Sequence, residues 1–314
     1  MTELKPLMII AGPTACGKSA AAVECALKLN GEVISADSMQ VYRGMDIGTA
    51  KITAEEMKGV PHHLLDVLDP SEDFNIKLFK DLCLEAMEGI YSRGHLPIIC
   101  GGTGFYIQSV LRNVDLEEAP DTGIRKELEA EDPEKLFEML KEIDPASAEA
   151  IHPNNVKRVI RAIEFYRETG RPISEHNAEQ RQNEYAYNAG YYVLCDDRAV
   201  MYERIDRRVD KMAENGLVEE VKALKAAGMK RGSVAMQGLG YKEIFAYLDG
   251  EISLDEALYT IKRDSRHFAK RQLTWFKREG EAVTWVDRTA FTDPEREIPA
   301  FICRDFENRI MTKA

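Results

Sequence analysis

One stretch near the N-terminus has the residue types and the spacing of a phosphate-binding loop. Residues 12–19 read GPTACGKS and match the pattern G-x-x-x-x-G-K-[S/T]. They follow the apolar run 7–11 and precede residues 20–29, whose composition favours a helix. Glycines let backbone amides converge on an anion, and the positive end of the following helix adds to the attraction. The sequence therefore predicts a phosphate cradle between a strand and a helix.

The side chains of this loop carry groups suited to a bound phosphate. Lys18 supplies a positive charge for the terminal phosphate, and the Ser19 hydroxyl is placed to bind Mg²⁺. The predicted phosphate-binding residues are Gly12, Pro13, Thr14, Ala15, Cys16, Gly17, Lys18 and Ser19. Because such a loop can hold ATP, GTP or any diphosphate, the pattern alone does not identify the reaction.

Two more polar groups are expected at the same edge of a sheet. Asp37 follows the short apolar segment 32–36, and Thr103 follows the apolar run 96–100 and two glycines. Ligands of open parallel sheets bind outside the carboxyl ends of the strands, so both side chains should face the phosphate loop. The adjacent histidines, His62 and His63, would point to opposite faces of a strand and are not expected to share a metal ion.

Composition is that of an ordinary globular protein. The 314 residues are 44% hydrophobic and 31% charged, and no apolar run is long enough to span a membrane. The six cysteines are widely spaced without a C-x-x-C pair, which argues against a zinc site or a disulfide framework. We therefore expect a cytoplasmic protein with cysteines in its core. Cys16 is the expected exception, because a thiol near a helix N-terminus is prone to oxidation.

Charge is unevenly distributed along the chain. The formal net charge is −12, which argues against a uniformly basic nucleic-acid-binding protein. Residues 115–144 contain twelve acidic and four basic residues, whereas residues 262–278 contain seven basic residues and one acidic residue. The second segment is part of a long predicted helix capped by Ser253, and tryptophan and phenylalanine lie among its basic residues. A local nucleic-acid-binding surface is therefore compatible with the acidic total.

Alternating strands and helices predict an α/β fold, a P-loop NTPase-like doubly wound parallel sheet. Strands are expected at residues 7–11, 32–36, 62–67, 96–100, 191–195 and 283–287. No strand pattern occurs between Leu111 and Gly190. We therefore predict a mainly helical insertion domain at residues 115–188 within a core of residues 1–114 and 189–314. Gly31 is expected to end the first helix, and the tail after residue 289 carries little signal.

On the residues alone, a P-loop kinase remains open, because Asp37 could bind Mg²⁺. Eight ordered blocks of the chain form a more specific pattern. They are GPTACGKS at 12–19, DSMQVYRGMDIGTAK at 37–51, PHHLLD at 61–66, GGTGFY at 101–106, HPNNVKRVIRAIE at 152–164, GLVEEV at 216–221, QGLGYKE at 237–243 and KRQLTWF at 270–276. Together these blocks resemble the tRNA dimethylallyltransferases, also called isopentenyl-tRNA transferases. The resemblance extends nearly from end to end. The chain has no C-terminal cysteine–histidine cluster, which indicates the bacterial type.

The resemblance implies transfer of a dimethylallyl group from dimethylallyl diphosphate to the exocyclic amine of the adenosine 3′-adjacent to the anticodon, with release of pyrophosphate. The phosphate loop would hold the donor with Mg²⁺. The implied catalytic residues are Asp37, Thr103, Lys18 and Arg208. Asp37 would accept the proton of the amine, and Arg208 would stabilise the departing pyrophosphate. Arg204 and Arg207 remain alternatives to Arg208.

The resemblance also implies contacts with the tRNA anticodon stem-loop, whose adenosine must leave the base stack to react. The implied tRNA-binding residues are Asp37, Ser38, Met39, Gln40, Thr103, Arg125, Lys157, Arg158, Val159, Ile160, Arg161, Gln237, Gly238, Leu239, Gly240, Tyr241, Lys242, Lys270, Arg271, Gln272, Leu273, Thr274, Trp275, Phe276 and Lys277. We expect a monomer with no membrane partner. The alternatives are an adenylate isopentenyltransferase acting on AMP, a small-molecule kinase and a non-catalytic RNA-binding protein.

Overall fold

The computed structural model describes residues 4–116 and 123–313 and divides into two compact units. One unit comprises Met1–Leu111 and Ala186–Ala314, and the other comprises Arg112–Tyr185. The predicted insertion domain, residues 115–188, begins and ends a few residues later than the second unit. Each unit has an apolar core of its own.

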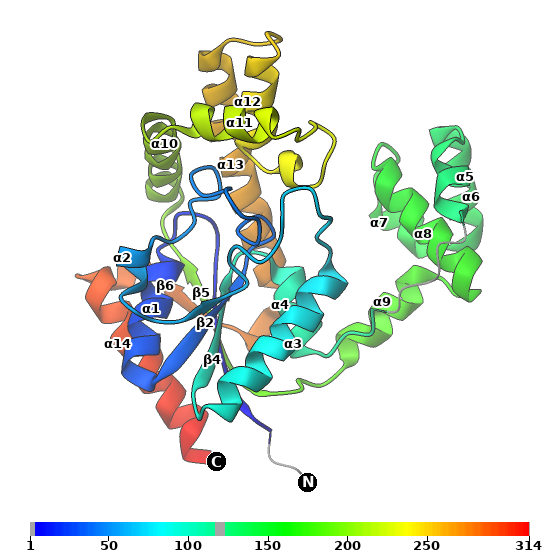
Figure 1. Ribbon diagram of the computed structural model, residues 1–314. Coiled ribbons are helices and arrows are strands. Elements are labelled where there is room, and N and C mark those ends of the chain that lie inside the picture. The colour runs from blue at the N-terminus through cyan, green and yellow to red at the C-terminus, as the bar shows by residue number, and fades with distance from the viewer. Residues whose placement is uncertain (1–3, 117–122, 314) are drawn as a thin grey trace. The chain divides into compact units, whose positions relative to one another are not determined.

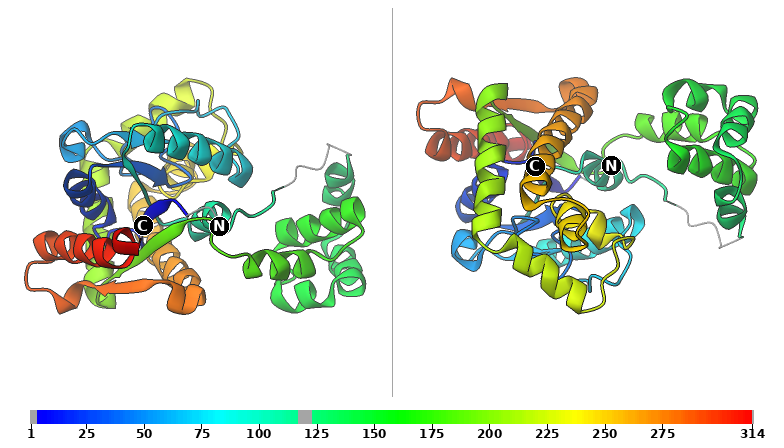
Figure 2. Two further views of the ribbon diagram at one scale, coloured as in Figure 1. Left: turned by 90° about the horizontal axis from the view of Figure 1, so that it is seen from below. Right: turned by 90° about the horizontal axis from the view of Figure 1, so that it is seen from above.

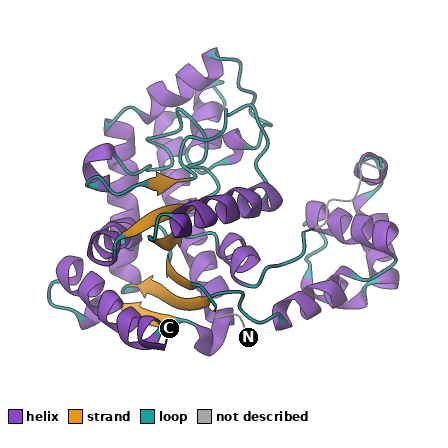
Figure 3. Ribbon diagram, turned by 60° about the horizontal axis from the view of Figure 1, so that its bottom comes forward, coloured by secondary structure: helices purple, strands orange, loops and turns teal. Residues whose placement is uncertain are grey.

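The first unit is built on one parallel six-stranded sheet in the order β3-β2-β4-β1-β5-β6. Its strands are β1 Pro6–Ala11, β2 Gly31–Ala36, β3 His62–His63, β4 Leu96–Gly101, β5 Asn188–Cys195 and β6 Thr284–Asp287. The sheet runs between helices (Figure 3). Because both faces are covered, the central strands are almost continuously apolar, as expected for a parallel sheet. The predicted α/β fold with a doubly wound parallel sheet is confirmed.

Helices cover both faces of this sheet (Figure 1). α1 Lys18–Leu29 packs against α14 Pro294–Arg309 on one face, and α3 Ile76–Ser92 packs against α4 Gly104–Leu111 on the other. The remaining elements of this unit are α2 Ala54–Met57, α10 Arg198–Glu214, α11 Leu217–Ala226, η1 Ala235–Gln237, α12 Tyr241–Leu248, α13 Leu254–Phe276, η2 Lys277–Ala282, η3 Arg288–Ala290 and η4 Met311–Lys313. Figure 2 shows α10 and α13 side by side, as their packing requires.

α14 is an element that the sequence analysis missed. It begins with Pro294, which the first turn of a helix tolerates, but it also contains Pro299, an interior proline that weakens a helical pattern. Its apolar residues Ile298, Ile302 and Phe306 are nonetheless buried in the core that includes α1. Tertiary burial therefore stabilises a helix that local sequence preference does not predict.

Two local predictions were wrong. Asn30, with φ of 51°, ends α1, and Gly31 already belongs to β2. Gly31 is required by packing instead, because a Cβ atom there would lie 2.9 Å from the Leu96 carbonyl oxygen. The strand predicted at 62–67 contains only His62–His63, since Leu64 and Asp66 adopt left-handed conformations, with φ of 61° and 55°.

The described residues of the second unit form five helices around a small apolar core. They are α5 Ile124–Glu129, α6 Pro133–Ile143, α7 Pro145–Ala150, α8 Val156–Thr169 and α9 Ile173–Gln182. Asp144 joins three of these helices, because its buried carboxylate accepts hydrogen bonds from the backbone and hydroxyl groups of Ser147 and Ser174. These four hydrogen bonds compensate the cost of burying the charge.

A buried carboxylate also ties β2 to the neighbouring elements of the first unit. Glu32, with a side chain only 3% exposed, lies 2.7 Å from Nη2 of Arg93, 2.7 Å from Nε2 of His63 and 2.6 Å from Nδ1 of His95. The hydrogen bond from Arg93 is the largest cause that lowers the pKa of Glu32, to about 2. His63 is thus a partner of Glu32, while Nδ1 of His62 contacts the Val60 carbonyl oxygen.

We predict that Glu32→Gln lowers the free energy of unfolding by about 2 to 3 kcal/mol at pH 7. Since folding lowers the pKa of Glu32 from 4.5 to about 2, the contribution is complete above the unfolded value and is lost as the pH falls towards 2. Urea unfolding of the native protein and the variant from pH 7 to pH 3 measures the difference. A difference that stays constant over this range would contradict the prediction.

Candidate active site

Three loops meet at the carboxyl edge of the sheet because their strands end in register. Ala11 of β1 and Ala36 of β2 both pair with Gly101 of β4, which lies between them. A Cβ atom at position 101 would lie only 2.3 Å from the Ala36 carbonyl oxygen, so this close approach requires glycine. The segments that follow carry the phosphate loop, Asp37 and Thr103, which the structure brings to one edge as predicted.

Two glycines of the phosphate loop adopt backbone conformations with positive φ. Gly12 and Gly17 have φ of 148° and 85°, and a Cβ atom on Gly12 would lie 2.6 Å from the Leu194 carbonyl oxygen. Lys18 folds back over the loop and donates a hydrogen bond to the Pro13 carbonyl oxygen at 3.3 Å. A bound phosphate would offer this ammonium group a better acceptor, because that acceptor carries a full negative charge.

Cys16 lies on the core side of the loop. Its side chain is 1% exposed and belongs to the apolar cluster beneath α1. The expected oxidation-sensitive thiol is therefore a buried core residue, since a reactive cysteine must be accessible. Five of the six cysteines are buried, and Cys195 is partly exposed.

Arg288 supports the phosphate loop from behind, and no pattern in the sequence pointed to it. Its side chain is 5% exposed. One guanidinium nitrogen donates to the Cys16 carbonyl oxygen at 3.3 Å, and the others lie 3.2 Å from Asp196 and 2.6 Å from Glu295. The carboxylates compensate the buried charge and fix its direction.

Arg208 is the arginine of α10 that faces the phosphate loop. Nη1 of Arg208 donates to the Thr14 hydroxyl at 3.1 Å, and Nη2 donates to the Ala50 carbonyl oxygen at 3.4 Å. Burial lowers the pKa of Arg208, and the nearby charge of Asp37 acts in the opposite direction. Arg204 instead pairs with Asp196 at 2.6 Å, and Arg207 pairs with Glu203 on the surface. The geometry thus separates Arg208 from its two alternatives.

Asp37 is oriented by its own turn. Its Oδ1 atom accepts a hydrogen bond from the Met39 backbone amide at 2.9 Å. Within residues 4–116 and 123–313, its Oδ2 atom has no hydrogen-bond partner, and the side chain is partly exposed. Asp37 therefore combines a fixed orientation with an accessible acceptor, the two properties that a general base requires.

The loop that follows Asp37 is held by side chains directed into the protein. The carboxamide of Gln40 accepts from the Ser35 hydroxyl at 3.0 Å and donates to the Thr49 carbonyl oxygen at 3.3 Å. Lys51, with a side chain only 5% exposed, contacts Asp46 and Asp66 at 2.6 Å each. Gln40 thus has a structural role in addition to its predicted contact with tRNA.

Glu220 anchors the same loop from α11. Its carboxylate accepts hydrogen bonds from the backbone amides of residues 46, 47 and 48 at 2.9, 2.7 and 3.0 Å. It also accepts one from the Tyr241 hydroxyl at 2.6 Å. Burial raises the pKa of Tyr241, so this hydroxyl remains protonated and can donate. Gly48 is needed for this contact, since a Cβ atom there would lie 2.5 Å from the Tyr241 ring.

The basic residues of α13 fall into two groups. Those of its middle turns are ion-paired with acidic residues, Lys262 with Asp210 at 2.5 Å, Arg263 with Asp264 at 2.8 Å and Arg266 with Asp206 at 2.6 Å. Those at its end and just beyond are exposed and have no ion-pair partner in the described part of the chain. They are Lys270, Arg271, Lys277 and Arg278. Only the second group is free to bind phosphates without breaking an ion pair.

Three other side chains of the 270–277 block are less exposed. Phe276 is fully buried, and its ring contacts the ring of Tyr191 edge-on. Trp275 packs on Gly104 and lies 6.0 Å from Phe105, measured between ring centroids. Gln272 is 7% exposed and points towards the phosphate loop. For these three residues the structure shows contacts within the protein.

The 237–242 block lies against the loop that follows Asp37. A Cβ atom on Gly238 would lie 3.0 Å from the Met39 sulfur, so two predicted tRNA-binding segments touch each other. Gly238, Gly240 and Tyr241 are buried. Gln237 is exposed and donates to the Arg231 carbonyl oxygen at 2.6 Å.

The helical unit carries two of the predicted tRNA-binding cations on its surface. Lys157 and Arg158 of α8 are exposed, whereas Val159 and Ile160 are buried in the core of the unit. The side chains of Val159 and Ile160 are therefore not available to RNA. Two other predicted contacts converge on the buried Glu164, which lies 3.1 Å from Arg161 and 4.0 Å from Arg125.

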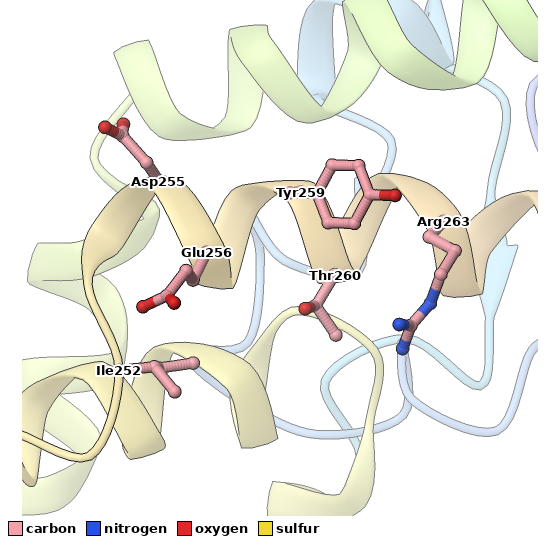
Figure 4. A pocket seen from close by; sticks show the side chains of 6 residues that line it. All are labelled: Ile252, Asp255, Glu256, Tyr259, Thr260 and Arg263. Carbon is pink, nitrogen blue, oxygen red and sulfur yellow. The ribbon is translucent and has the colours of Figure 1, made fainter.

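An open depression of about 450 Å³ lies at the start of α13, several turns before Gln272 (Figure 4). It is lined by Ile252, Asp255, Glu256, Tyr259, Thr260 and Arg263. None of these six residues belongs to the loops at the sheet edge. Within the described residues, no group of three or more histidine, cysteine, aspartate or glutamate side chains could hold a metal ion. A search of the same residues finds no helix long and apolar enough to cross a membrane.

Comparison with known proteins identifies the family. The family model described as IPP transferase matches residues 40–279, and the model described as isopentenyl transferase matches residues 5–69. A tRNA dimethylallyltransferase of Lachnoclostridium phytofermentans is 59% identical over 290 residues, which cover 91% of this chain and 92% of that protein. This chain belongs to the IPP transferase family. The resemblance stated from the sequence blocks is confirmed.

Solved structures agree with this assignment. A full-length tRNA isopentenylpyrophosphate transferase from Bacillus halodurans is 47% identical, with a TM-score of 0.73 and coverage of 99% of both chains. A eukaryotic dimethylallyltransferase, described as acting on tRNA, is 32% identical, with a TM-score of 0.83 and coverage of 97% of this chain and 80% of that chain.

We predict that Glu220→Gln loosens the loop at residues 46–48. An amide in place of the carboxylate loses an acceptor and turns its NH₂ group towards backbone donors, which costs about 1 to 3 kcal/mol. Hydrogen exchange should show the amides of residues 46, 47 and 48 exchanging at least about tenfold faster. The exposed neighbour offers a control, Glu219→Gln, in which their protection should be native. Equal protection in both variants would refute the role of Glu220.

Proposed function

We propose that this protein transfers a dimethylallyl group from dimethylallyl diphosphate to the exocyclic amine of the adenosine 3′-adjacent to the anticodon of tRNA, and releases pyrophosphate. One observation carries the proposal beyond family membership. Asp37 and Thr103 lie at the same sheet edge as the phosphate loop, so an acceptor base and a diphosphate donor can meet there.

The chemistry assigns a task to each catalytic group. The amine of adenine is a weak nucleophile, because its lone pair is delocalised into the ring. As its nitrogen forms a bond to the first carbon of the donor, the carbon–oxygen bond to the diphosphate breaks, and Asp37 accepts the proton released from nitrogen. Thr103 lies beside this path and is proposed to contact the adenine.

Negative charge accumulates on the departing pyrophosphate. The amides of the phosphate loop, Lys18 and Arg208 are placed to stabilise it, since Arg208 already contacts Thr14 of the loop. Ser19, exposed at the start of α1, fits a Mg²⁺ ion held jointly with the diphosphate oxygens. Bound there, Mg²⁺ would neutralise charge on the leaving group.

RNA binding is assigned to exposed basic residues that have no acidic partner within the described residues. On the first unit these include Lys270, Arg271 and Lys277, and on the helical unit they include Lys157 and Arg158. Phosphate contacts of this kind provide most of the salt-dependent affinity for RNA. They favour a tRNA acceptor over free AMP, which is small and does not need these phosphate contacts.

We further propose that the protein acts as a monomer in the cytoplasm.

The decisive experiment combines the reaction with loss of the proposed base. We predict that native protein, Mg²⁺ and dimethylallyl diphosphate add one five-carbon unit to an unmodified anticodon stem-loop, detected by mass spectrometry. Asp37→Asn should lower kcat by about 10²- to 10⁴-fold, because the amide cannot accept the proton. Affinity for the stem-loop should remain within about twofold of native.

Other outcomes separate the alternatives. Modification of AMP but not of the stem-loop would indicate an adenylate isopentenyltransferase, and phosphate transfer from ATP would indicate a kinase. Native kcat in Asp37→Asn would exclude Asp37 as the base.

We predict that Arg271→Ala weakens stem-loop binding and lowers the slope of log affinity against log salt concentration by about one. Arg263→Ala is the matched control on the same helix. Arg263 is already paired with Asp264, so its loss should leave the slope unchanged. Fluorescence titrations between low and moderate salt concentrations measure both slopes. Equal slopes in the two variants would contradict the assignment of the unpaired residues to RNA.

A further inference from the structure

Gln272 connects the proposed RNA-binding helix to two loops of the donor site. Its Oε1 atom accepts a hydrogen bond from the backbone amide of Thr14 in the phosphate loop at 3.0 Å. Its Nε2 atom donates to the carbonyl oxygen of Gly102, next to Thr103, also at 3.0 Å. Both ends of one carboxamide therefore bridge the loops that follow β1 and β4.

The surroundings of Gln272 leave it little freedom to point elsewhere. The residue is 7% exposed, and a Cβ atom on Gly102 would lie only 2.0 Å from its Nε2 atom. Glycine at position 102 therefore makes room for this amide. Thr14 is held from a second direction, because its hydroxyl accepts a hydrogen bond from Arg208.

The same turn of α13 has an outer face with different chemistry. Lys270 and Arg271 are exposed and, within the described residues, have no ion-pair partner, whereas Ala269 and Phe276 are buried with Gln272. A ligand that fixes the outer face of this turn also fixes the backbone that carries Gln272. One turn of helix thus faces the solvent on one side and the phosphate loop on the other.

We propose that Gln272 is a positioning residue that couples occupancy of α13 by tRNA to binding of the donor diphosphate. The RNA half of this coupling rests on the proposed function, while the hydrogen bonds to the two loops are independent of it. Gln272 belongs to a block assigned to tRNA contact, but its side chain acts on the other substrate.

The physical basis is preorganisation. Loop amides bind a phosphate best when no conformational freedom has to be lost on binding. Gln272 restricts the loop at Thr14 and ties it to the strand end that carries Thr103. RNA bound to the outer face of α13 restricts the helix and therefore this bridge, so each substrate should strengthen the binding of the other by the same factor.

Two substitutions test the bridge. Gln272→Met removes both hydrogen bonds at nearly the same volume. Gln272→Glu keeps an acceptor for the Thr14 amide but turns a second acceptor towards the Gly102 carbonyl oxygen. The control is His267→Ala on the same helix, whose exposed side chain lies apart from both loops. Thermal unfolding of each variant shows whether the fold is intact.

The measurement is calorimetric titration of the full chain with Mg²⁺ and pyrophosphate, with and without the anticodon stem-loop. Gln272→Met should weaken pyrophosphate binding about tenfold, because both bridge hydrogen bonds are lost. Gln272→Glu should weaken it at least as much, because its carboxylate faces the Gly102 carbonyl oxygen and repels the diphosphate. Stem-loop affinity without pyrophosphate should stay within about twofold of native. In native protein the stem-loop should tighten pyrophosphate binding about threefold or more, and in Gln272→Met this factor should approach one. In turnover assays KM for the donor should rise more than kcat falls.

Native pyrophosphate affinity in both folded variants would overturn the proposal. If Gln272→Met unfolds, the coupling factor of Gln272→Glu decides the question, since direct repulsion of pyrophosphate by the carboxylate lowers the affinity equally with and without the stem-loop. A native coupling factor in Gln272→Glu would then overturn the proposal. Absence of coupling in the native protein would overturn the link to RNA. Failure of the proposed function would look different, because the native protein would then bind pyrophosphate but neither bind nor modify the stem-loop.

Discussion

The parallel register of three adjacent strands is the constraint on which the site depends. β1, β4 and β2 end at the same level, with Gly101 between Ala11 and Ala36. Because parallel strands place their carboxyl ends at one edge, loops distant in sequence become neighbours there. The absence of a side chain at position 101 lets the backbones approach closely enough for the Thr103 amide to reach the carbonyl oxygen of Ala36, the residue before Asp37. Proximity of acceptor and donor groups is therefore a property of the sheet.

Side chains from the second half of the chain fix these loops. Arg208 contacts Thr14 and Ala50, Gln272 bridges the phosphate loop and Gly102, and Glu220 binds three amides of the loop after Asp37. The charged or amide group of each of these three side chains forms hydrogen bonds to backbone atoms of the loops. Such hydrogen bonds define distance and direction better than apolar contacts do. The helices after β5 thus define the geometry of loops that precede it, and the site requires both halves of the chain.

The sequence predicted the features of the site that have a local pattern, but not those that depend on contacts between distant parts of the chain. The phosphate loop was found because its signal is local, eight residues with fixed spacing, and the meeting of Asp37 with Thr103 follows from a general rule of parallel sheets. Three features of the site depend on packing and have no local pattern. They are the support of the phosphate loop by Arg288, the burial of Cys16 and the inward direction of Gln272. α14 was not predicted because its interior Pro299 weakens the sequence pattern of a helix that burial stabilises. The functional roles of the individual site residues stay predictions.

Net charge is a poor guide to the partner of this protein, and the ion pairs explain why. The formal charge of the chain is −12, but this total does not show which basic residues are paired with acidic ones and which are unpaired. Along α13, acidic residues of α10 pair with Lys262 and Arg266, so the middle of this basic helix serves the packing of two helices. Among the described residues of this helix, the unpaired cations are confined to the end nearest the phosphate loop. An RNA drawn to those cations would therefore be drawn towards the edge where Asp37 and Thr103 lie, so a few well-placed charges suffice despite the acidic total.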